Sequence, residues 1–384
     1  MLIYLIATAL SCWLAWKGER ADRKWPWRIA SAIPLTLVAA LRWGVGTDVG
    51  FLYLPQFTAV EWIHGGATPK LAEQLYRPLI DGGIRWPFVR SPLNAAQVFW
   101  RNFNVEEIGY RWLVLGIVHC GGGFQWFTAI TSSLVGLLVF TAIWRQSRCP
   151  WQSVFLYVMT SNYFLSLNIV RQYVAIGLVL VSVTFVIQRR LFWFLLCVGV
   201  GMTFHRSALL ALPIWFLPQV RIRLGWCFVL VGLAALLSAV IVPFVARLLP
   251  LIGLGIYTKY FTARVAKDGF EWIFFLINLS FMVMGAWYFL RAAKNSPYFN
   301  VWYLMTVFGT LALACSAVIP LMKRINYYFA APQFLLLPEM LGAEENVRLR
   351  KWLTVLSLLA FLAETIVAVG FLNKNEPLPY RIVI

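Results

Sequence analysis

Charged residues are scarce in this chain, and acidic ones most of all. Only 12% of the 384 residues are charged, with 15 Asp and Glu against 33 Lys and Arg, whereas 61% are apolar. A soluble domain has roughly a quarter of its residues charged. One protein core could not hide so much apolar surface from water, but a lipid bilayer accepts it as a solvent. The composition therefore excludes a soluble globular protein and indicates membrane-spanning helices.

Paired cysteines are lacking as well. The six cysteines are scattered with no CxxC spacing, and most lie in apolar runs, where Cys usually acts as a small hydrophobe. We therefore expect no disulfide, no metal site and no cofactor. The net charge of +18 does not indicate nucleic-acid binding, because the Lys and Arg residues lie in short loops between apolar runs. Orientation in the bilayer, contact with anionic lipid and, for a few of them, an anionic substrate explain these residues better.

Twelve apolar runs predict an all-α fold, in which residues 1–384 form a single integral membrane domain, a polytopic bundle of about 12 transmembrane helices. The predicted spans are residues 2–16, 29–41, 124–144, 151–166, 168–187, 191–204, 207–219, 224–242, 271–290, 300–319, 325–341 and 352–372. Positive charge follows the first run instead of preceding it, so we expect a retained helix there and not a cleavable signal peptide.

The short loops on one side of this topology are all basic, which predicts that they face the cytoplasm and that both termini lie outside. They contain Lys17, Arg20, Arg23, Lys24 and Arg28, then Arg145 and Arg148, Arg189 and Arg190, Arg221 and Arg223, Arg291 and Lys294, and Arg348, Arg350 and Lys351. Residues 108–120 do not fit this count, because a helix there would be only about 20 Å long. We interpret them as a re-entrant or interfacial external helix. Two long external loops are expected at residues 42–107 and 243–270.

Unusual polar side chains gather at the external ends of the predicted spans. They are Arg42, Asp48, Glu106, Glu107, Tyr110, Arg171, His205, Arg206, Lys323, Arg324, Tyr380 and Arg381. Taken singly, several are explained as snorkelling anchors, and His205 as a hydrogen-bonded interfacial histidine. Arg171 is hardest to explain in this way, because a guanidinium inside a span is costly unless it is paired or faces water. Together they predict one external cavity in which arginines bind a lipid-linked diphosphate and an Asp, Glu or His deprotonates an attacking hydroxyl.

Several motifs, in order along nearly the whole chain, resemble the EpsG-like branch of the Wzy-type polysaccharide (O-antigen or exopolysaccharide) polymerases. The matching pieces are Arg42 with Gly46-Thr47-Asp48, Glu107-Ile108-Gly109-Tyr110, Asn168 with Arg171-Gln172 and Ala175, Phe204-His205-Arg206-Ser207-Ala208-Leu209, Arg324 with Tyr327-Tyr328-Phe329, and Pro379-Tyr380-Arg381. The chain departs from the pattern at Val49, where an aromatic residue often follows the Asp, and in the length of the segment after Asp48.

The resemblance implies a glycosyltransferase in the bacterial cytoplasmic (inner) membrane, with its active site facing the periplasm or exterior. It would move a growing glycan from undecaprenyl diphosphate onto another lipid-linked repeat unit. The partners implied are that lipid-linked glycan, the bilayer, and the flippase and chain-length regulator of the same pathway. The catalytic candidates are Asp48 or His205 as general base, with Glu107 in reserve. The binding candidates are Arg171, Arg206 and Arg324 for the diphosphate, Arg42 in support of Asp48, and Gln172, Tyr328, Tyr380 and Arg381.

Two other functions remain open at this point. An O-antigen ligase-type transferase would use the same donor with a different acceptor, and only the ordered motifs favour the polymerase. A lipid-linked oligosaccharide flippase or other transporter belongs to a different class of protein. A transporter needs charged residues near the middle of the membrane, whereas these lie near one face.

Overall fold

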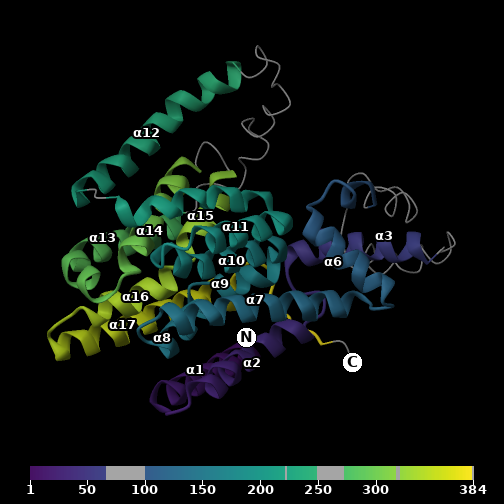
Figure 1. Ribbon diagram of the computed structural model, residues 1–384, viewed down its shortest axis with the longest axis horizontal. Helices are drawn as coiled ribbons and strands as arrows, with labels where there is room; N and C mark the ends of the chain where they lie inside the picture. Colours follow the sequence, from purple (N-terminus) through teal and green to yellow (C-terminus); the bar gives the residue numbers. More distant parts are fainter. Residues whose placement is uncertain (66–99, 221–222, 249–271, 317–320, 383–384) are drawn as a thin grey trace.

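The computed structural model describes residues 1–65, 100–220, 223–248, 272–316 and 321–382. Figure 1 shows a bundle of helices, and within these ranges the β-type pairing is limited to an isolated bridge between Arg42 and Ile382. The prediction of an all-α fold is confirmed. The helices are α1 (Leu2–Arg20), α2 (Lys24–Leu41), the π-helix η1 (Val49–Tyr53), α3 (Leu54–His64), α6 (Ile108–His119), α7 (Phe124–Gln146), α8 (Pro150–Met159), α9 (Asn162–Asn168), α10 (Val170–Ile187), α11 (Leu191–Phe204), the 3-10 helix η2 (Arg206–Gln219), α12 (Leu224–Leu248), α13 (Trp272–Asn295), α14 (Phe299–Cys315), α15 (Leu321–Ala330), α16 (Gln333–Gly342), α17 (Val347–Thr365) and the π-helix η6 (Ile366–Phe371).

Helix α10 forms the centre of the bundle. Of its most apolar 18-residue window, 78% is buried, against 17% for the corresponding window of α17 and η6 on the outside. Helices α7, α9, α11, η2 and α15 all contact α10. The N-terminal hairpin of α1 and α2 packs against α7 and α8 at one edge (Figure 1). The first turn of α10 is therefore surrounded by other elements on several sides.

Several predicted spans are not continuous α-helices. The run 151–166 is divided between α8 and α9, because Ser161 takes a left-handed conformation with φ of 61°. The run 325–341 is divided between α15 and α16 at a turn that contains Pro332, whose ring removes a backbone donor. The run 207–219 forms the 3-10 helix η2, which contains Pro213 and Pro218.

Fewer helices of the described residues have the length and hydropathy of a membrane span than the twelve spans that the sequence predicts. Among the described residues, four helices are long and apolar enough to cross a membrane: Phe124–Gln146, Val170–Ile187, Trp272–Asn295 and Val347–Phe371. The helices Leu191–Phe204, Leu224–Ser238 and Phe299–Cys315 are apolar but shorter. A count of twelve is not confirmed.

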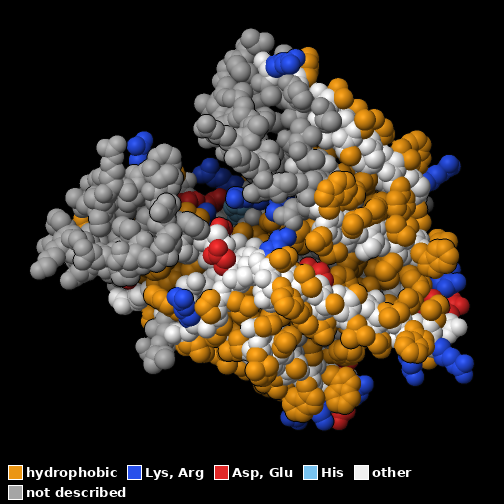
Figure 2. All heavy atoms as spheres, turned by 180° about the vertical axis from the view of Figure 1, so that it is seen from behind, with side chains coloured by type: hydrophobic (Ala, Val, Ile, Leu, Met, Phe, Trp, Pro, Cys, Tyr) orange, Lys and Arg blue, Asp and Glu red, His pale blue; other side chains and the backbone are white. Residues whose placement is uncertain are grey.

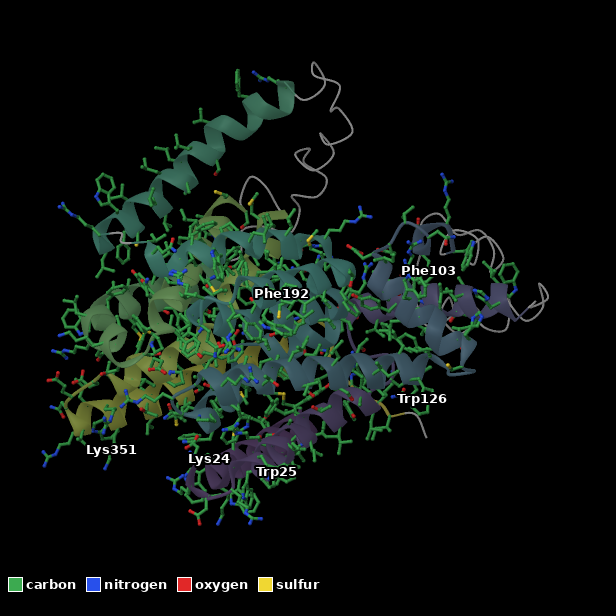
Figure 3. All side chains as sticks on the ribbon, viewed as in Figure 1. Lys24, Trp25, Phe103, Trp126, Phe192 and Lys351 are labelled. Carbon is green, nitrogen blue, oxygen red and sulfur yellow. The ribbon has the colours of Figure 1, made fainter. Side chains whose placement is uncertain are left out.

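The surface is that of a membrane protein. Figure 2 shows hydrophobic side chains over most of one face, and large apolar side chains on the outer helices, such as Trp287 and Phe371, are about 80% exposed. Lys24 and Lys351, both expected on the cytoplasmic side, lie toward one end of the molecule, and Phe103 and Trp126 lie toward the other (Figure 3). The lysines at one end and the apolar side chains exposed on the outer helices match a bundle whose helices face lipid and whose basic end faces water.

The predicted external segments contain further helices. The run expected to be re-entrant is the 12-residue helix α6, which ends before Gly121, a residue with φ of 73°. Within the predicted loop 42–107, η1 and α3 pack with α6 to one side of the bundle (Figure 1). Helix α12 extends to Leu248, into the predicted loop 243–270, and the rest of that loop lies outside the described residues.

Candidate functional site

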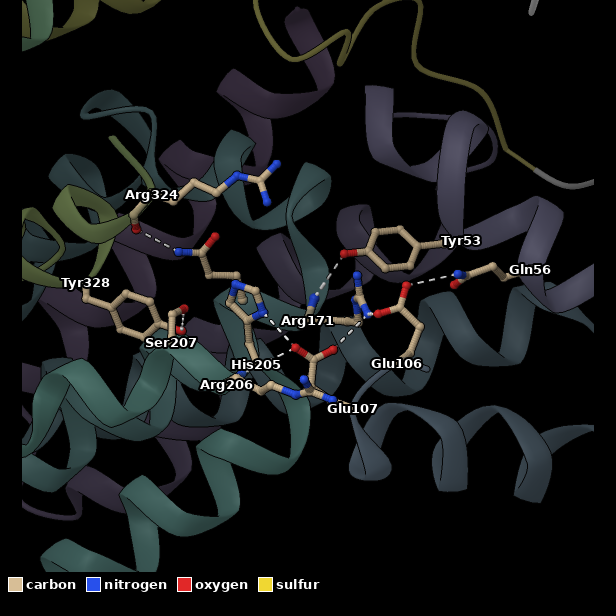
Figure 4. Close-up of polar contacts among 11 residues, drawn as sticks. Tyr53, Gln56, Glu106, Glu107, Arg171, His205, Arg206, Ser207, Arg324 and Tyr328 are labelled. Carbon is tan, nitrogen blue, oxygen red and sulfur yellow. Dashed lines mark hydrogen bonds and ion pairs between the residues drawn. The ribbon is translucent and has the colours of Figure 1, made fainter. Parts of the chain in front are cut away.

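An arginine and two glutamates meet where α10 begins and α6 begins. Glu106 lies in the turn before α6, Glu107 is the N-cap residue of that helix, and Arg171 lies in the first turn of α10. The Arg171 Nη1 atom forms an ion pair with Glu106 Oε2 and another with Glu107 Oε2 at 3.0 Å (Figure 4). These three side chains are only 11–18% exposed. The two ion pairs therefore offset the cost of placing the charge of Arg171 near lipid.

Two aromatic rings and an amide hold Arg171 and Glu106 in place. The guanidinium carbon of Arg171 lies 4.8 Å from the ring centre of Tyr110 and 5.7 Å from that of Tyr53, which is cation–π geometry. The Gln56 amide donates a hydrogen bond to Glu106 Oε1 (3.0 Å) and accepts one from the Tyr110 hydroxyl (2.9 Å). In this conformation Arg171 fixes the two carboxylates and does not offer its guanidinium to a ligand.

His205 faces the other oxygen of Glu107. The residue links α11 to η2 in an extended conformation, and its Nδ1 atom lies 3.3 Å from Glu107 Oε1. The backbone amide of Arg206 donates to the same oxygen, also at 3.3 Å. Burial alone would raise the pKa of Glu107, but the hydrogen bond from His205 and the charge of Arg171 outweigh it and lower this pKa to about 2.

The low pKa of Glu107 determines which nitrogen of His205 carries the proton. An ionised carboxylate can only accept hydrogen bonds, so His205 Nδ1 must be the donor. In a neutral imidazole the lone pair is then on Nε2, for which no hydrogen bond is found among the described residues. A carboxylate that orients a histidine in this way leaves the second nitrogen available as a base.

Close packing of α6 on α11 brings Glu107 to His205. An ideal Cβ atom at Gly109 would lie 2.9 Å from both the Cβ and the carbonyl oxygen of Thr203, closer than any ordinary contact. Only glycine permits this approach. Gly109, two residues after Glu107, and Thr203, two residues before His205, therefore set the distance across the site.

Asp48 enters the site from the turn after α2. Gly46 has φ of 102°, and a Cβ atom there would meet the carbonyl oxygen of Leu167 at 2.9 Å, so the turn requires glycine. The Asp48 amide donates to Asn168 Oδ1 at 2.7 Å, which fixes the turn against the end of α9. Burial raises the pKa of Asp48, an effect opposed by the positive charges of Arg324 and Arg171.

Helix α15 supplies the opposite wall. The Gln172 side-chain amide donates to the carbonyl oxygen of Arg324 at 2.8 Å, and the Ser207 hydroxyl donates to the phenolic hydroxyl of Tyr328 at 3.1 Å. Figure 4 shows the Arg324 side chain extending from this wall over the site. The structure thus brings together Gln172, Arg324 and Tyr328 with the Glu107–His205 pair.

Two arginines at this site have exposed guanidinium groups. Arg206 and Arg324 are exposed, and among the residues that the structure describes neither has a carboxylate within ion-pair distance. Figure 2 shows acidic and basic side chains and a histidine gathered in one recess of an otherwise apolar face. Two exposed guanidinium groups near an imidazole are an arrangement that can bind an anion beside a proton acceptor.

Three candidates from the sequence lie elsewhere. Arg42 is 3% exposed and donates to Ser132 Oγ (2.8 Å) and to the carbonyl oxygens of Ala39 and Leu167, not to Asp48. Arg42 points inward because the chain turns away at Gly44 and Gly46 immediately after it.

The other two belong to the C-terminal segment. Tyr380 donates to the carbonyl oxygen of Val38 (2.9 Å), and the Arg381 carbonyl accepts a hydrogen bond from the Trp43 amide (2.9 Å). These residues fasten the C-terminal segment to the end of α2 and are structural in this conformation.

Sequence reasoning missed four residues that shape the site: Tyr53, Gln56, Asn168 and Ser207. Asn168 and Ser207 stand inside the matching motifs, so their position was a usable signal. Gln56 is fully buried in α3, within the segment predicted to be an external loop, and nothing local indicated it. Among the described residues, no group of three His, Cys, Asp or Glu side chains could hold a metal ion.

Comparison with known proteins indicates the family of the chain. The family model described as the EpsG family matches residues 25–382, nearly the whole chain and every residue of the site. No curated protein and no solved structure matches.

Proposed function

Because the chain belongs to the EpsG family, a membership that indicates a membrane glycosyltransferase of the polysaccharide polymerase type, we propose that it joins polyprenyl-diphosphate-linked repeat units at the external face of the cytoplasmic membrane. The observation that carries this proposal is the Glu107–His205 pair beside the exposed arginines Arg206 and Arg324. A base and an anion site close together are what transfer from a diphosphate leaving group requires.

The reaction needs one proton acceptor and one leaving group. His205 Nε2 takes the proton from a hydroxyl at the non-reducing end of the acceptor glycan. That oxygen attacks C1 of the sugar that ends the growing chain, and the bond between C1 and the diphosphate oxygen breaks. The polyprenyl diphosphate leaves with the electron pair of that bond. Ionised Glu107 stabilises the imidazolium that forms, since it already accepts from Nδ1.

Arg206 and Arg324 bind the diphosphate in this proposal. Negative charge grows on the leaving oxygen during the transfer, and guanidinium groups near it lower the barrier. Arg171 acts as a positioning residue, because it is held by Glu106 and Glu107. Asp48, whose pKa is raised by burial, is the second candidate for the base.

The test uses purified protein in detergent with a polyprenyl-diphosphate-linked repeat unit and measures glycan length by mass spectrometry. Wild-type protein should extend the chain, which a flippase cannot do where no compartments exist. We expect His205→Ala to lower the rate by 100-fold or more, within the usual range of about 10²–10⁴ for general-base loss. His119→Ala, which changes an exposed histidine at the far end of α6, is the matched control and should retain full activity.

The outcomes separate the alternatives. If His205→Ala still extends the chain and Asp48→Asn does not, the general base is Asp48. Transfer of a single glycan to a lipid A core, without chain extension, identifies a ligase. Wild-type protein that is folded but extends no chain with any lipid-linked repeat unit refutes the proposal.

A further inference from the structure

A groove between α2 and α7 lies at the opposite end of these helices from the candidate site. Its volume is about 430 Å³, and its walls include Ile29, Ile33 and Leu37 from α2 and Leu137 and Phe140 from α7. The lining residues of α2 run from position 28 to position 37, so the groove is about 14 Å long at 1.5 Å per residue. An apolar groove of this length suits an acyl chain.

Two arginines flank one end of the groove. Arg28 lies in the first turns of α2 and Arg145 in the last turn of α7, and both are exposed. Neither has a carboxylate within ion-pair distance in the described parts of the chain. The Arg28 guanidinium lies 5.6 Å from the ring centre of Trp144, and the Trp144 indole donates to Ser31 Oγ at 3.1 Å. The arginine end is therefore built around a fixed tryptophan.

We propose that this groove binds an anionic phospholipid of the bilayer, with its phosphate between Arg28 and Arg145 and one acyl chain along α2 and α7. Thr141, one turn before Arg145 on the same wall, offers a hydroxyl to the ester region of the lipid. Basic pockets between membrane helices recognise anionic headgroups through this combination of charge and apolar contact. The site is independent of the proposed glycosyl transfer, because none of its residues belongs to the candidate active site.

The test is native mass spectrometry of the full-length protein in detergent, titrated with phosphatidylglycerol or with phosphatidylcholine of the same acyl chains. Wild-type protein should bind phosphatidylglycerol more tightly. The Arg28→Gln/Arg145→Gln double variant should lose about 30-fold in affinity for phosphatidylglycerol, which corresponds to about 1 kcal/mol for each basic residue near a membrane surface. The matched control is Arg223→Gln/Arg348→Gln, which changes two exposed arginines outside the groove and should bind as wild type.

A second variant tests the groove without touching its charges. Ser133 is exposed on the α7 wall, and Ser133→Trp should fill the groove and weaken binding of both lipids at this site. Ser280→Trp on α13 is the corresponding control, since Ser280 is also exposed but lies elsewhere. Equal binding of the two lipids to wild-type protein, or an unchanged preference in the double arginine variant, overturns the proposal. Displacement of phosphatidylglycerol by equimolar polyprenyl phosphate also overturns it and assigns the groove to the lipid-linked substrate.

Discussion

Substitution of one glycine should separate the two halves of the candidate site. In Gly109→Ala, the new methyl group would lie 2.9 Å from the carbonyl oxygen of Thr203, whereas ordinary contact begins near 3.4 Å. Rotation of the Thr203 side chain cannot relieve this clash, because the atom that the new methyl group meets belongs to the backbone. Helix α6 must therefore move away from α11 by about 0.5 Å or more.

The movement acts directly on the pair formed by Glu107 and His205. Their hydrogen bond is already long at 3.3 Å, and a further 0.5 Å takes it beyond the range of a useful hydrogen bond. Misplacement of a catalytic group by about 1 Å can cost 10²-fold in rate, so we expect a loss of roughly 10- to 100-fold. Overpacking should also lower the free energy of unfolding by about 1–3 kcal/mol.

Gly116 provides a control on the same helix. A Cβ atom there meets nothing within 4 Å, so Gly116→Ala should retain activity and raise stability by about 0.4–1 kcal/mol through reduced entropy of the unfolded chain. The assays are chain extension in detergent and thermal unfolding of the same samples. Full activity of a folded Gly109→Ala variant would refute the reasoning, because the close approach of α6 and α11 would then not set the geometry of the site. Equal loss in both variants would refute it too.

Three further predictions concern single charged residues. Arg206→Ala and Arg324→Ala should each raise the KM for the lipid-linked donor at least tenfold, since a charge-assisted hydrogen bond contributes about 1.5–3 kcal/mol, whereas Arg381→Ala should not change it in steady-state kinetics. Glu107 has a pKa lowered from 4.5 to about 2, so its ionised form stabilises the fold above pH 4.5 and this contribution is lost as the pH falls toward 2. The difference in thermal unfolding between wild type and Glu107→Gln should therefore shrink from pH 7 to pH 3, and a constant difference would contradict the lowered pKa. Arg42→Ala should lower the free energy of unfolding by about 3 kcal/mol or more, because it removes buried hydrogen bonds to two carbonyl oxygens, and unchanged thermal unfolding would refute that role.

Hydrophobic runs allowed most helices to be predicted from the sequence but not their breaks. The predicted spans 124–144 and 191–204 coincide closely with α7 and α11. A long apolar segment in lipid must form a helix, because only a helix satisfies its backbone hydrogen bonds within the segment. The break at Ser161 depends on a single left-handed residue that carries no Gly or Pro signal. The helix α3 within the predicted loop 42–107 was equally hidden, because it packs against α6 and α7, which lie far from it in the sequence.

The charged residues of the candidate site could be predicted from the sequence, but the contacts among them could not. Charged residues at external helix ends identified Glu107, Arg171, His205 and Arg324, because such residues are costly near lipid unless they have a role. The same criterion selected Arg42, whose buried charge is instead stabilised by hydrogen bonds to the carbonyl oxygens of Ala39 and Leu167. Which arginine is paired and which is free depends on the packing of α6 against α10 and α11, and no local pattern in the sequence encodes it.

The pairing of Arg171 has a consequence for where an anion can bind. One guanidinium between two carboxylates leaves a net negative charge on that side of the site, with Glu107 ionised at neutral pH. In the proposed reaction, a diphosphate would be repelled from this side and attracted to Arg206 and Arg324, which form no ion pair with a carboxylate among the described residues. His205 lies against Glu107, on the negatively charged side of the site. In the proposed reaction, the exposed arginines would therefore hold the diphosphate leaving group, and His205, oriented by Glu107, would receive the proton of the acceptor hydroxyl.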